Sequence, residues 1–166
     1  MAKTFILDGA IGQGDGEISA LMVRNWLQSA AGDDIEVHIH SEGGSVFEGF
    51  AIHDAIAAYP GRKVAVVASA AFSAASFILC AFDEVQATPN AYTMIHNAHF
   101  EEGDETPSQK KLLANLCDRM AGIYARKTGK PLSVIQRAMS LECFYDAEAS
   151  IDFGLVDRIA ATKSPA

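Results

Sequence analysis

A serine in the middle of the chain stands where nucleophilic catalysis could take place. Ser73 lies where the apolar, strand-like run from Lys63 passes into a helix-like segment, and alanines flank it on both sides. A hydroxyl at a helix N-terminus is often only a cap, worth about 1 kcal/mol. The position also suits a nucleophile, because the helix dipole and the free N–H of the next residue would stabilise negative charge on a bound carbonyl. Ser69 falls inside the strand and Ser76 one turn into the helix, so Ser73 is the candidate.

A histidine follows at the end of the next strand-like segment. His96 lies 23 residues beyond Ser73, after the run AYTMI. The three earlier histidines are most simply solvated or packed, since two fall on the polar face of a strand and one in mid-helix. His96 and His99 resemble a metal pair, but no carboxylate or cysteine pair accompanies them at ligand spacing. We therefore expect no metal.

Two glycine-rich segments each separate a strand from a helix. The segment 9–16 has neither the G-x-G-x-x-G spacing nor a G-K-[ST] ending, and its carboxylates would repel phosphate, so it is interpreted as a flexible turn. Gly43 and Gly44 directly follow the alternating strand IEVHIH. Adjacent glycines there form either a tight turn or a corner whose N–H groups face an anion or oxyanion.

Composition and charge exclude several classes of function. The 166 residues are 49% hydrophobic and 20% charged, as in an ordinary globular protein, and the net charge is −8 with no basic run. Nucleic acid and anionic membranes are therefore not expected partners. The three unpaired cysteines favour a reducing compartment. Nineteen uncharged residues after Lys63 are long enough for a membrane helix, but the run begins β-branched and contains serines, which favours a buried strand and then a buried helix.

Strands alternate with helices along the whole chain. This order predicts an α/β fold with mostly parallel strands and right-handed crossovers. Thr106 followed by Pro107 predicts the start of a long helix that Gly129 ends, and Asp146 predicts the cap of a final helix. The expected strands are 4–7, 35–40, from 63, 84–87, 91–95 and 155–160, and the expected helices are 17–31, 46–59, from 73, 106–129, 133–139 and 146–154.

Four segments, in order, resemble the ClpP-type serine peptidases: SEGGSVFEGFAIHDAI, SAAFSAASFILCAFDEV, NAYTMIHNAHF and DAEASIDFGLVD. The resemblance is greatest to the phage and prophage ClpP-like head maturation proteases, which share the S-A-A-S and M-I-H-N forms. It implies a ClpP/crotonase-like α/β fold of repeated β-β-α units. It also implies a single domain over residues 1–166, with a protruding handle helix within about 97–130.

The resemblance also implies roles for particular residues. Ser73 matches the family nucleophile and His96 its general base, while Gly44 and Ala74 match the residues whose N–H groups form the oxyanion hole. The implied reaction is peptide-bond cleavage through an acyl-enzyme, without a cofactor.

The third member of the triad departs from the better-known family pattern. Glu142 aligns where those members carry Asp, and a glutamate can still accept the histidine N–H. Asp146 is nearby, but its context already explains it as a helix cap, so Glu142 is preferred. Glu42 stands where the family usually has proline, and Phe72 replaces a smaller residue beside the nucleophile.

The resemblance further implies a homo-oligomeric ring whose enclosed chamber admits unfolded proteins or peptides. The face of helix 106–127 that carries Leu113, Cys117 and Tyr124 is wide, and either a neighbouring subunit or a broad contact within the chain would cover it. The chain begins almost at its first strand and lacks the family segment that meets an ATPase, so no ATPase partner is expected. We expect a cytoplasmic protein of a bacterial host or phage procapsid, acting in capsid or scaffold maturation.

Two other classes remain as alternatives. Crotonase-type acyl-CoA enzymes share this fold and a pair of backbone amides, but they use carboxylates and need no Ser/His pair. A non-catalytic ring-forming scaffold protein would keep the fold and lose the chemistry. An esterase of the α/β-hydrolase type is disfavoured, because Ser73 lacks the G-x-S-x-G elbow.

Overall fold

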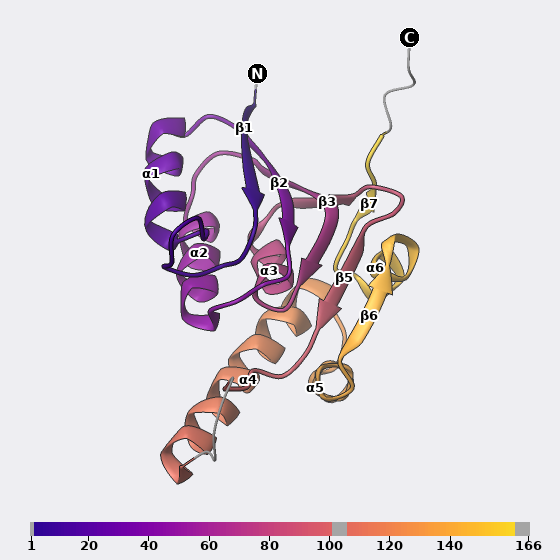
Figure 1. Cartoon of the computed structure of the whole chain (residues 1–166). Coiled ribbons are helices and arrows are strands. Elements are labelled where there is room, and N and C mark those ends of the chain that lie inside the picture. Colours follow the sequence, from indigo (N-terminus) through magenta and orange to yellow (C-terminus); the bar gives the residue numbers. More distant parts are fainter. Residues whose placement is uncertain (1, 101–105, 162–166) are drawn as a thin grey trace.

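A twisted sheet with helices against it forms the molecule in the computed structural model, which describes residues 2–100 and 106–161 (Figure 1). Five strands follow the order β1-β2-β3-β4-β7, while β5 pairs with β3, and β6 pairs with β5. All pairs are parallel except β5 with β6. The strands are β1 (Lys3–Asp8), β2 (Ile35–Ser41), β3 (Lys63–Phe72), β4 (Glu84–Ala87), β5 (Tyr92–Ile95), β6 (Cys143–Asp146) and β7 (Arg158–Ile159).

The helices lie in two groups. The first three pack in succession on one side of the sheet, whereas α4 extends away from the body and α5 and α6 lie beside β6 (Figure 1). The helices are α1 (Ala20–Ala30), α2 (Val46–Ala57), α3 (Ala74–Ile78), α4 (Pro107–Thr128), α5 (Leu132–Ser140) and α6 (Ala147–Phe153), with a 3₁₀ turn η1 (Leu79–Ala81) after α3. The predicted α/β fold with mostly parallel strands and a protruding helix is confirmed.

Local signals explain where the later helices begin and end. The Thr106 hydroxyl accepts from Gln109 N, the Gln109 side chain accepts from Thr106 N, and Gly129 adopts the left-handed conformation that ends α4. Asp146 caps α6, as predicted, by accepting from Ala149 N at 2.8 Å. In the described part of the chain, no helix is long and apolar enough to cross a bilayer.

The central strand β3 changes neighbour along its length. Its first half pairs with β4, at 64–67, and its last three residues pair with β5, at 70–72, while β2 lies along its other side. The carboxyl ends of β2, β3 and β5 therefore meet at one edge of the sheet. The Gly43–Gly44 turn, Ser73 and His96 directly follow these three ends, which is where parallel α/β sheets place ligands.

Strand β6 was not predicted from the sequence. Its four residues, CFYD, alternate between half-buried and exposed, and so few residues give almost no periodic signal. The strand forms because its backbone pairs with β5 in antiparallel register, with Ile95 opposite Cys143. This register places Glu142 beside His96.

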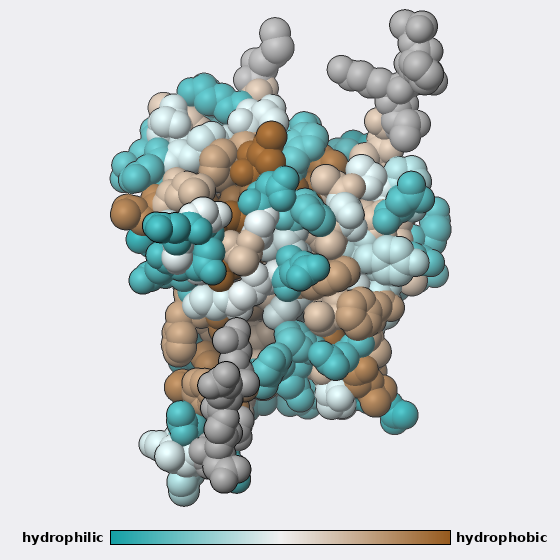
Figure 2. Space-filling view, in the orientation of Figure 1, coloured by the Kyte–Doolittle hydropathy of each residue, from teal (hydrophilic) through white to brown (hydrophobic). Residues whose placement is uncertain are grey.

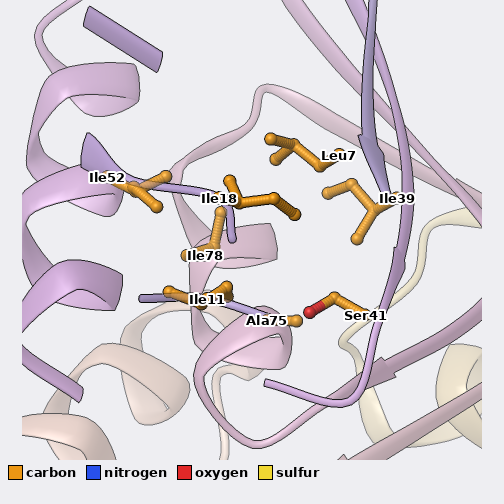
Figure 3. Close-up of a pocket in the computed structure, with 8 residues that line it drawn as sticks. All are labelled: Leu7, Ile11, Ile18, Ile39, Ser41, Ile52, Ala75 and Ile78. Atoms are coloured by element: carbon orange, nitrogen blue, oxygen red, sulfur yellow. The ribbon is translucent and has the colours of Figure 1, made fainter. Parts of the chain in front are cut away.

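The glycine-rich segment 9–16 is more ordered than the predicted flexible turn. Ile11 N donates to Gly43 O at 2.8 Å, and Ser45 N donates to Ile11 O at 2.8 Å, so the segment pairs with the second glycine turn. Beneath both lies an enclosed apolar cavity of about 10 Å³, lined among others by Ile11, Ile78 and Ser41 (Figure 3). The backbone of segment 9–16 thus helps to hold the Gly43–Gly44 turn in place.

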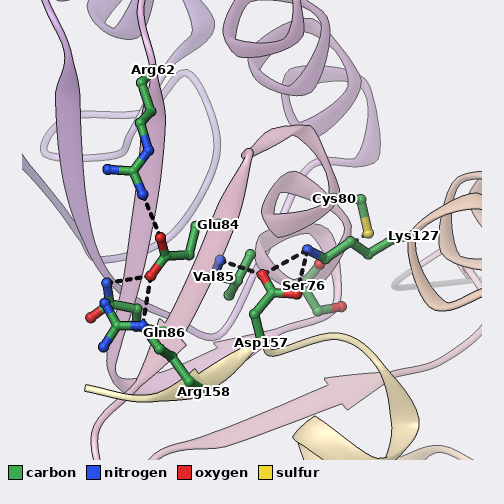
Figure 4. A network of polar contacts seen from close by, with 9 residues as sticks. All are labelled: Arg62, Ser76, Cys80, Glu84, Val85, Gln86, Lys127, Asp157 and Arg158. Carbon is green, nitrogen blue, oxygen red and sulfur yellow. Dashed lines mark hydrogen bonds and ion pairs between the residues drawn. The ribbon is translucent and has the colours of Figure 1, made fainter. Parts of the chain in front are cut away.

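Polar contacts fix the other end of the sheet and the base of α4. The Glu84 carboxylate pairs with Arg62 and, at 2.7 Å, with Arg158 Nε (Figure 4). Asp157 accepts from the backbone N–H of Val85 in β4 at 2.7 Å and pairs with Lys127 Nζ at 3.0 Å. The last turn of α4 is therefore tied to the sheet.

Candidate active site

Ser73 and His96 are in direct contact. Ser73 Oγ and His96 Nε2 are 2.7 Å apart, a hydrogen-bond distance, although 23 residues separate them in the chain. Because β3 and β5 pair in parallel, the residues that follow their ends are brought side by side. The tautomer with a proton on Nδ1 leaves Nε2 free to accept the serine proton.

The backbone at Ser73 is held in an unusual conformation. Its φ of 53° and ψ of −123° lie in a region that glycine favours, which costs a side-chain-bearing residue about 1–3 kcal/mol. Ser73 N donates to Met94 O at 2.9 Å and its carbonyl accepts from the first turn of α3, so both sides of the residue are fixed. This conformation presents the hydroxyl to the histidine, and the side chain does not cap α3.

Glu142 reaches the other ring nitrogen of His96. Glu142 Oε1 lies 3.4 Å from His96 Nδ1, and the carboxylate is 65% exposed against 12% for the imidazole. Glu142 has a φ of 51°, so two of the three non-glycine residues with positive φ in the described part of the chain belong to this cluster. The Asp146 carboxylate is engaged as the cap of α6, where it accepts from Ala149 N at 2.8 Å.

The pKa of His96 is shifted below its ordinary value of 6.5. Burial, which disfavours the imidazolium, is the main cause, and the Coulomb interaction with the neighbouring His99 acts in the same direction. The Glu142 carboxylate opposes both. The two imidazoles are stacked edge to face with centroids 5.3 Å apart. His96 is thereby kept neutral, as a general base must be.

Two backbone amides close to Ser73 have no hydrogen-bond partner in the described part of the chain. Gly44 N and Ala74 N find no hydrogen-bond acceptor among residues 2–100 and 106–161. Gly43 brings them close: it has a φ of +96°, and a Cβ there would lie 2.7 Å from Phe72 O and 2.8 Å from Ser73 Cβ. Only glycine lets the turn approach the serine so closely. The pair of unsatisfied N–H groups can stabilise an oxyanion.

A groove of the right size for a peptide lies over this cluster. The first cavity, of about 220 Å³, is lined by Glu42, Gly44, Val46, Ser73, Met94, His96, Ala98 and His99. A second cavity of about 530 Å³ shares four of these residues and continues between α2 and α4. Both have mostly apolar walls, so an extended peptide could bury side chains on either side of Ser73.

Other nucleophiles and metals find less support. Burial raises the pKa of the Cys80 thiol to about 12, which keeps it from acting as a thiolate. Within the described ranges, no group of three or more His, Cys, Asp or Glu side chains is placed to hold a metal ion.

The sequence analysis identified all five candidate side chains and amides, and the structure brings them together. It did not identify Gly43 as the residue that contacts the serine turn, although the double glycine was a signal. His99 was considered only as a metal ligand, whereas here its ring packs edge to face against His96.

The chain is similar to known proteins in both sequence and fold. A model of the Clp protease family matches residues 13–163. Among solved structures, a mutant of ClpP1 from Listeria monocytogenes superposes with a TM-score of 0.86 at 25% sequence identity, over 96% of this chain and 92% of that one.

Proposed function

The chain belongs to the Clp protease family of serine peptidases, and from that premise we propose that Ser73, His96 and Glu142 form its catalytic triad. The observation that carries the proposal is the 2.7 Å contact between Ser73 Oγ and His96 Nε2. The contact joins a nucleophile to a base whose pKa is lowered, at the carboxyl edge of the sheet.

The proposed reaction proceeds in two halves. Ser73 Oγ attacks the peptide carbonyl carbon while His96 Nε2 takes its proton, and Gly44 N–H and Ala74 N–H donate to the resulting oxyanion. His96 then returns that proton to the leaving amine, which departs as the C–N bond breaks. Water then attacks the acyl carbon while His96 takes one of its protons. The bond from the acyl carbon to Ser73 Oγ breaks, the carboxylic acid product leaves, and His96 returns the proton to Ser73 Oγ. Glu142 orients the ring and stabilises the imidazolium.

We further propose that the protein acts on unfolded proteins or peptides inside a homo-oligomeric ring, in phage capsid or scaffold maturation. Exposed apolar residues support the assembly. They gather over α5 and β6 at the lower right of Figure 2 and are Leu132, Val134, Leu141 and Phe144. A patch of this kind is typical of a surface that a partner covers. Native mass spectrometry should give a ring, and a monomer at micromolar concentration would contradict it.

The experiment for the triad uses a serine-directed fluorophosphonate. The probe should label the wild type at Ser73 and leave Ser73→Ala unlabelled, with peptide cleavage lost in the same variant. Ser69→Ala is the matched control, because Ser69 is an exposed serine of the same strand. Labelling that persists in Ser73→Ala would show that another serine is the nucleophile.

The two alternative classes give different results. A crotonase-type enzyme would bind acyl-CoA tightly and keep its turnover in His96→Ala. A scaffold would form intact rings without labelling or cleavage. The direct contact between serine and histidine favours the peptidase over both, since neither alternative requires it.

A further inference from the structure

Two buried hydroxyls lie close to the backbone carbonyl of Ser73. Ser76 Oγ donates to Ser73 O at 2.8 Å, and the Tyr124 hydroxyl lies 3.4 Å from the same oxygen. Backbone N–H groups of α3 also donate to it, from Ser76 at 2.9 Å and Phe77 at 3.4 Å. A carbonyl has two lone pairs, so this one is more heavily solvated by protein than helix formation alone requires.

The two hydroxyls form a chain that ends on this carbonyl. Ser76 Oγ and Tyr124 Oη are 2.5 Å apart, and both residues have 0% of their surface exposed. Because Ser76 has one hydroxyl proton and gives it to Ser73 O, the Tyr124 hydroxyl must donate to Ser76 Oγ. Burial raises the pKa of Tyr124 well above its usual range, which keeps the phenol protonated and able to donate.

The carbonyl of Ser73 and the N–H of Ala74 belong to the same peptide unit. That unit is planar and trans, so its C=O and N–H point in opposite directions and turn together. Fixing the carbonyl from the α4 side therefore also fixes the direction of the Ala74 N–H, which points the opposite way. Hydrogen bonds to the carbonyl also polarise the peptide and strengthen its N–H as a donor.

We infer that Tyr124 and Ser76 are positioning residues that aim the Ala74 amide at the oxyanion. The inference rests on the proposed function, because it concerns the same reaction. It assigns to α4, the protruding helix, a contact that sets the geometry of the site. At Tyr124, the wide apolar face of α4 is therefore buried by contacts within the same chain.

The base of α4 is held firmly enough to serve in this way. Lys127, one turn after Tyr124, pairs with Asp157 at the edge of the sheet, and Figure 4 shows this pair near Ser76. Thr128 Oγ1 donates to Tyr124 O at 2.8 Å. These contacts fix the helix at the position from which the phenol reaches α3.

The test compares Tyr124→Phe, Ser76→Ala and the double variant with the wild type. Loss of a whole oxyanion-hole donor costs about 10²–10³ in kcat, so loss of its alignment should lower kcat about tenfold with KM unchanged. A peptide boronate, whose tetrahedral adduct places an oxygen in the oxyanion hole, should bind more weakly by the same factor. Because the two hydroxyls act in series, the double variant should be no worse than Ser76→Ala alone.

Ser150→Ala is the matched control. Ser150 forms the other buried hydroxyl pair of the described chain, 2.8 Å from Thr93 Oγ1, so its loss tests the effect of a missing buried hydrogen bond in general. The control should lower the thermal midpoint while leaving kcat and boronate affinity unchanged.

Three results would overturn the inference. The first is an unchanged kcat in both Tyr124→Phe and Ser76→Ala. The second is a lower kcat in these variants without a parallel loss of boronate affinity. The third is an equally lowered kcat in the control Ser150→Ala. Fluorophosphonate labelling of the wild type distinguishes failure of the positioning role from failure of the proposed catalytic triad. Labelled wild type with unaffected variants overturns the positioning role alone, whereas unlabelled wild type overturns the triad and the positioning role with it.

Discussion

The two sides of His96 are built very differently. On one side Ser73 is fixed by β3, β5 and α3 and lies 2.7 Å from Nε2. On the other side Glu142 extends from the sheet edge, 65% exposed and 3.4 Å from Nδ1. The nucleophile and base are therefore a rigid pair, while the acid is held by one short antiparallel strand. Water screens an exposed carboxylate, so it stabilises the imidazolium less than a buried one would.

This difference indicates where the catalytic power of the site resides. A strained serine backbone, two unsatisfied amides and a buried hydroxyl chain all lie on the Ser73 side. We expect substitutions there to cost more than substitutions of the acid, although members of the proposed triad lie on both sides.

Apart from Ser73 itself, the largest effect is expected at the glycine turn. Gly43→Ala should lower kcat/KM at least about 10²-fold, because its Cβ would push the oxyanion turn away from Phe72 O and Ser73 Cβ. Gly129→Ala is the matched control: it has a similarly positive φ but no atom within 4 Å of the added Cβ. Peptide cleavage by both, with melting curves, would make the comparison. An equal loss of activity in the two variants would show that strain at a positive-φ glycine, and not the contact with the serine turn, causes the loss.

Removing the acid should cost less. Glu142→Gln should reduce kcat about tenfold, far below the roughly 10⁴-fold that follows removal of the charge of a buried triad aspartate. Steady-state kinetics on a peptide substrate would measure the difference. A loss near 10⁴-fold would mean that the carboxylate is buried in the active form, as a neighbouring subunit could arrange.

Substitutions of the two titratable neighbours of His96 should shift the pH profile of activity in opposite directions. The acidic limb of kcat/KM reports the pKa of the free base and should lie below 6.5 in the wild type. His99→Gln removes the Coulomb interaction that lowers the pKa of His96, so the limb should shift to higher pH. Glu142→Gln removes an anion that raises it, so the limb should shift to lower pH. Shifts of the same sign would contradict the charge assignment.

The smallest effect on activity is expected at the other nearby carboxylate. Asp146→Ala should leave kcat unchanged and lower stability by about 1 kcal/mol, because it removes the cap of α6. Denaturant unfolding and peptide cleavage would separate the two outcomes. A large loss of kcat in a folded variant would transfer the role of the acid from Glu142 to Asp146.

Most of the elements that position the site were predictable from local signals. Alternating Ile35, Val37 and Ile39 indicated β2, the threonine–proline pair indicated the start of α4, and the serine between two apolar runs marked the end of β3. The interpretation of residues 9–16 was too simple, because the hydrogen bonds of Ile11 to the second glycine turn join residues more than thirty positions apart.

By itself the sequence determined which residues could react, since strand ends, glycines and caps are set by neighbouring residues along the chain. Tertiary structure alone decided how they meet. The exposure of Glu142 follows from the register of β5 with β6, and the hydroxyl chain on the Ser73 carbonyl joins residues 48 positions apart. Such contacts arise from the packing of whole elements, whose free energy is shared among many residues, so no local pattern records them.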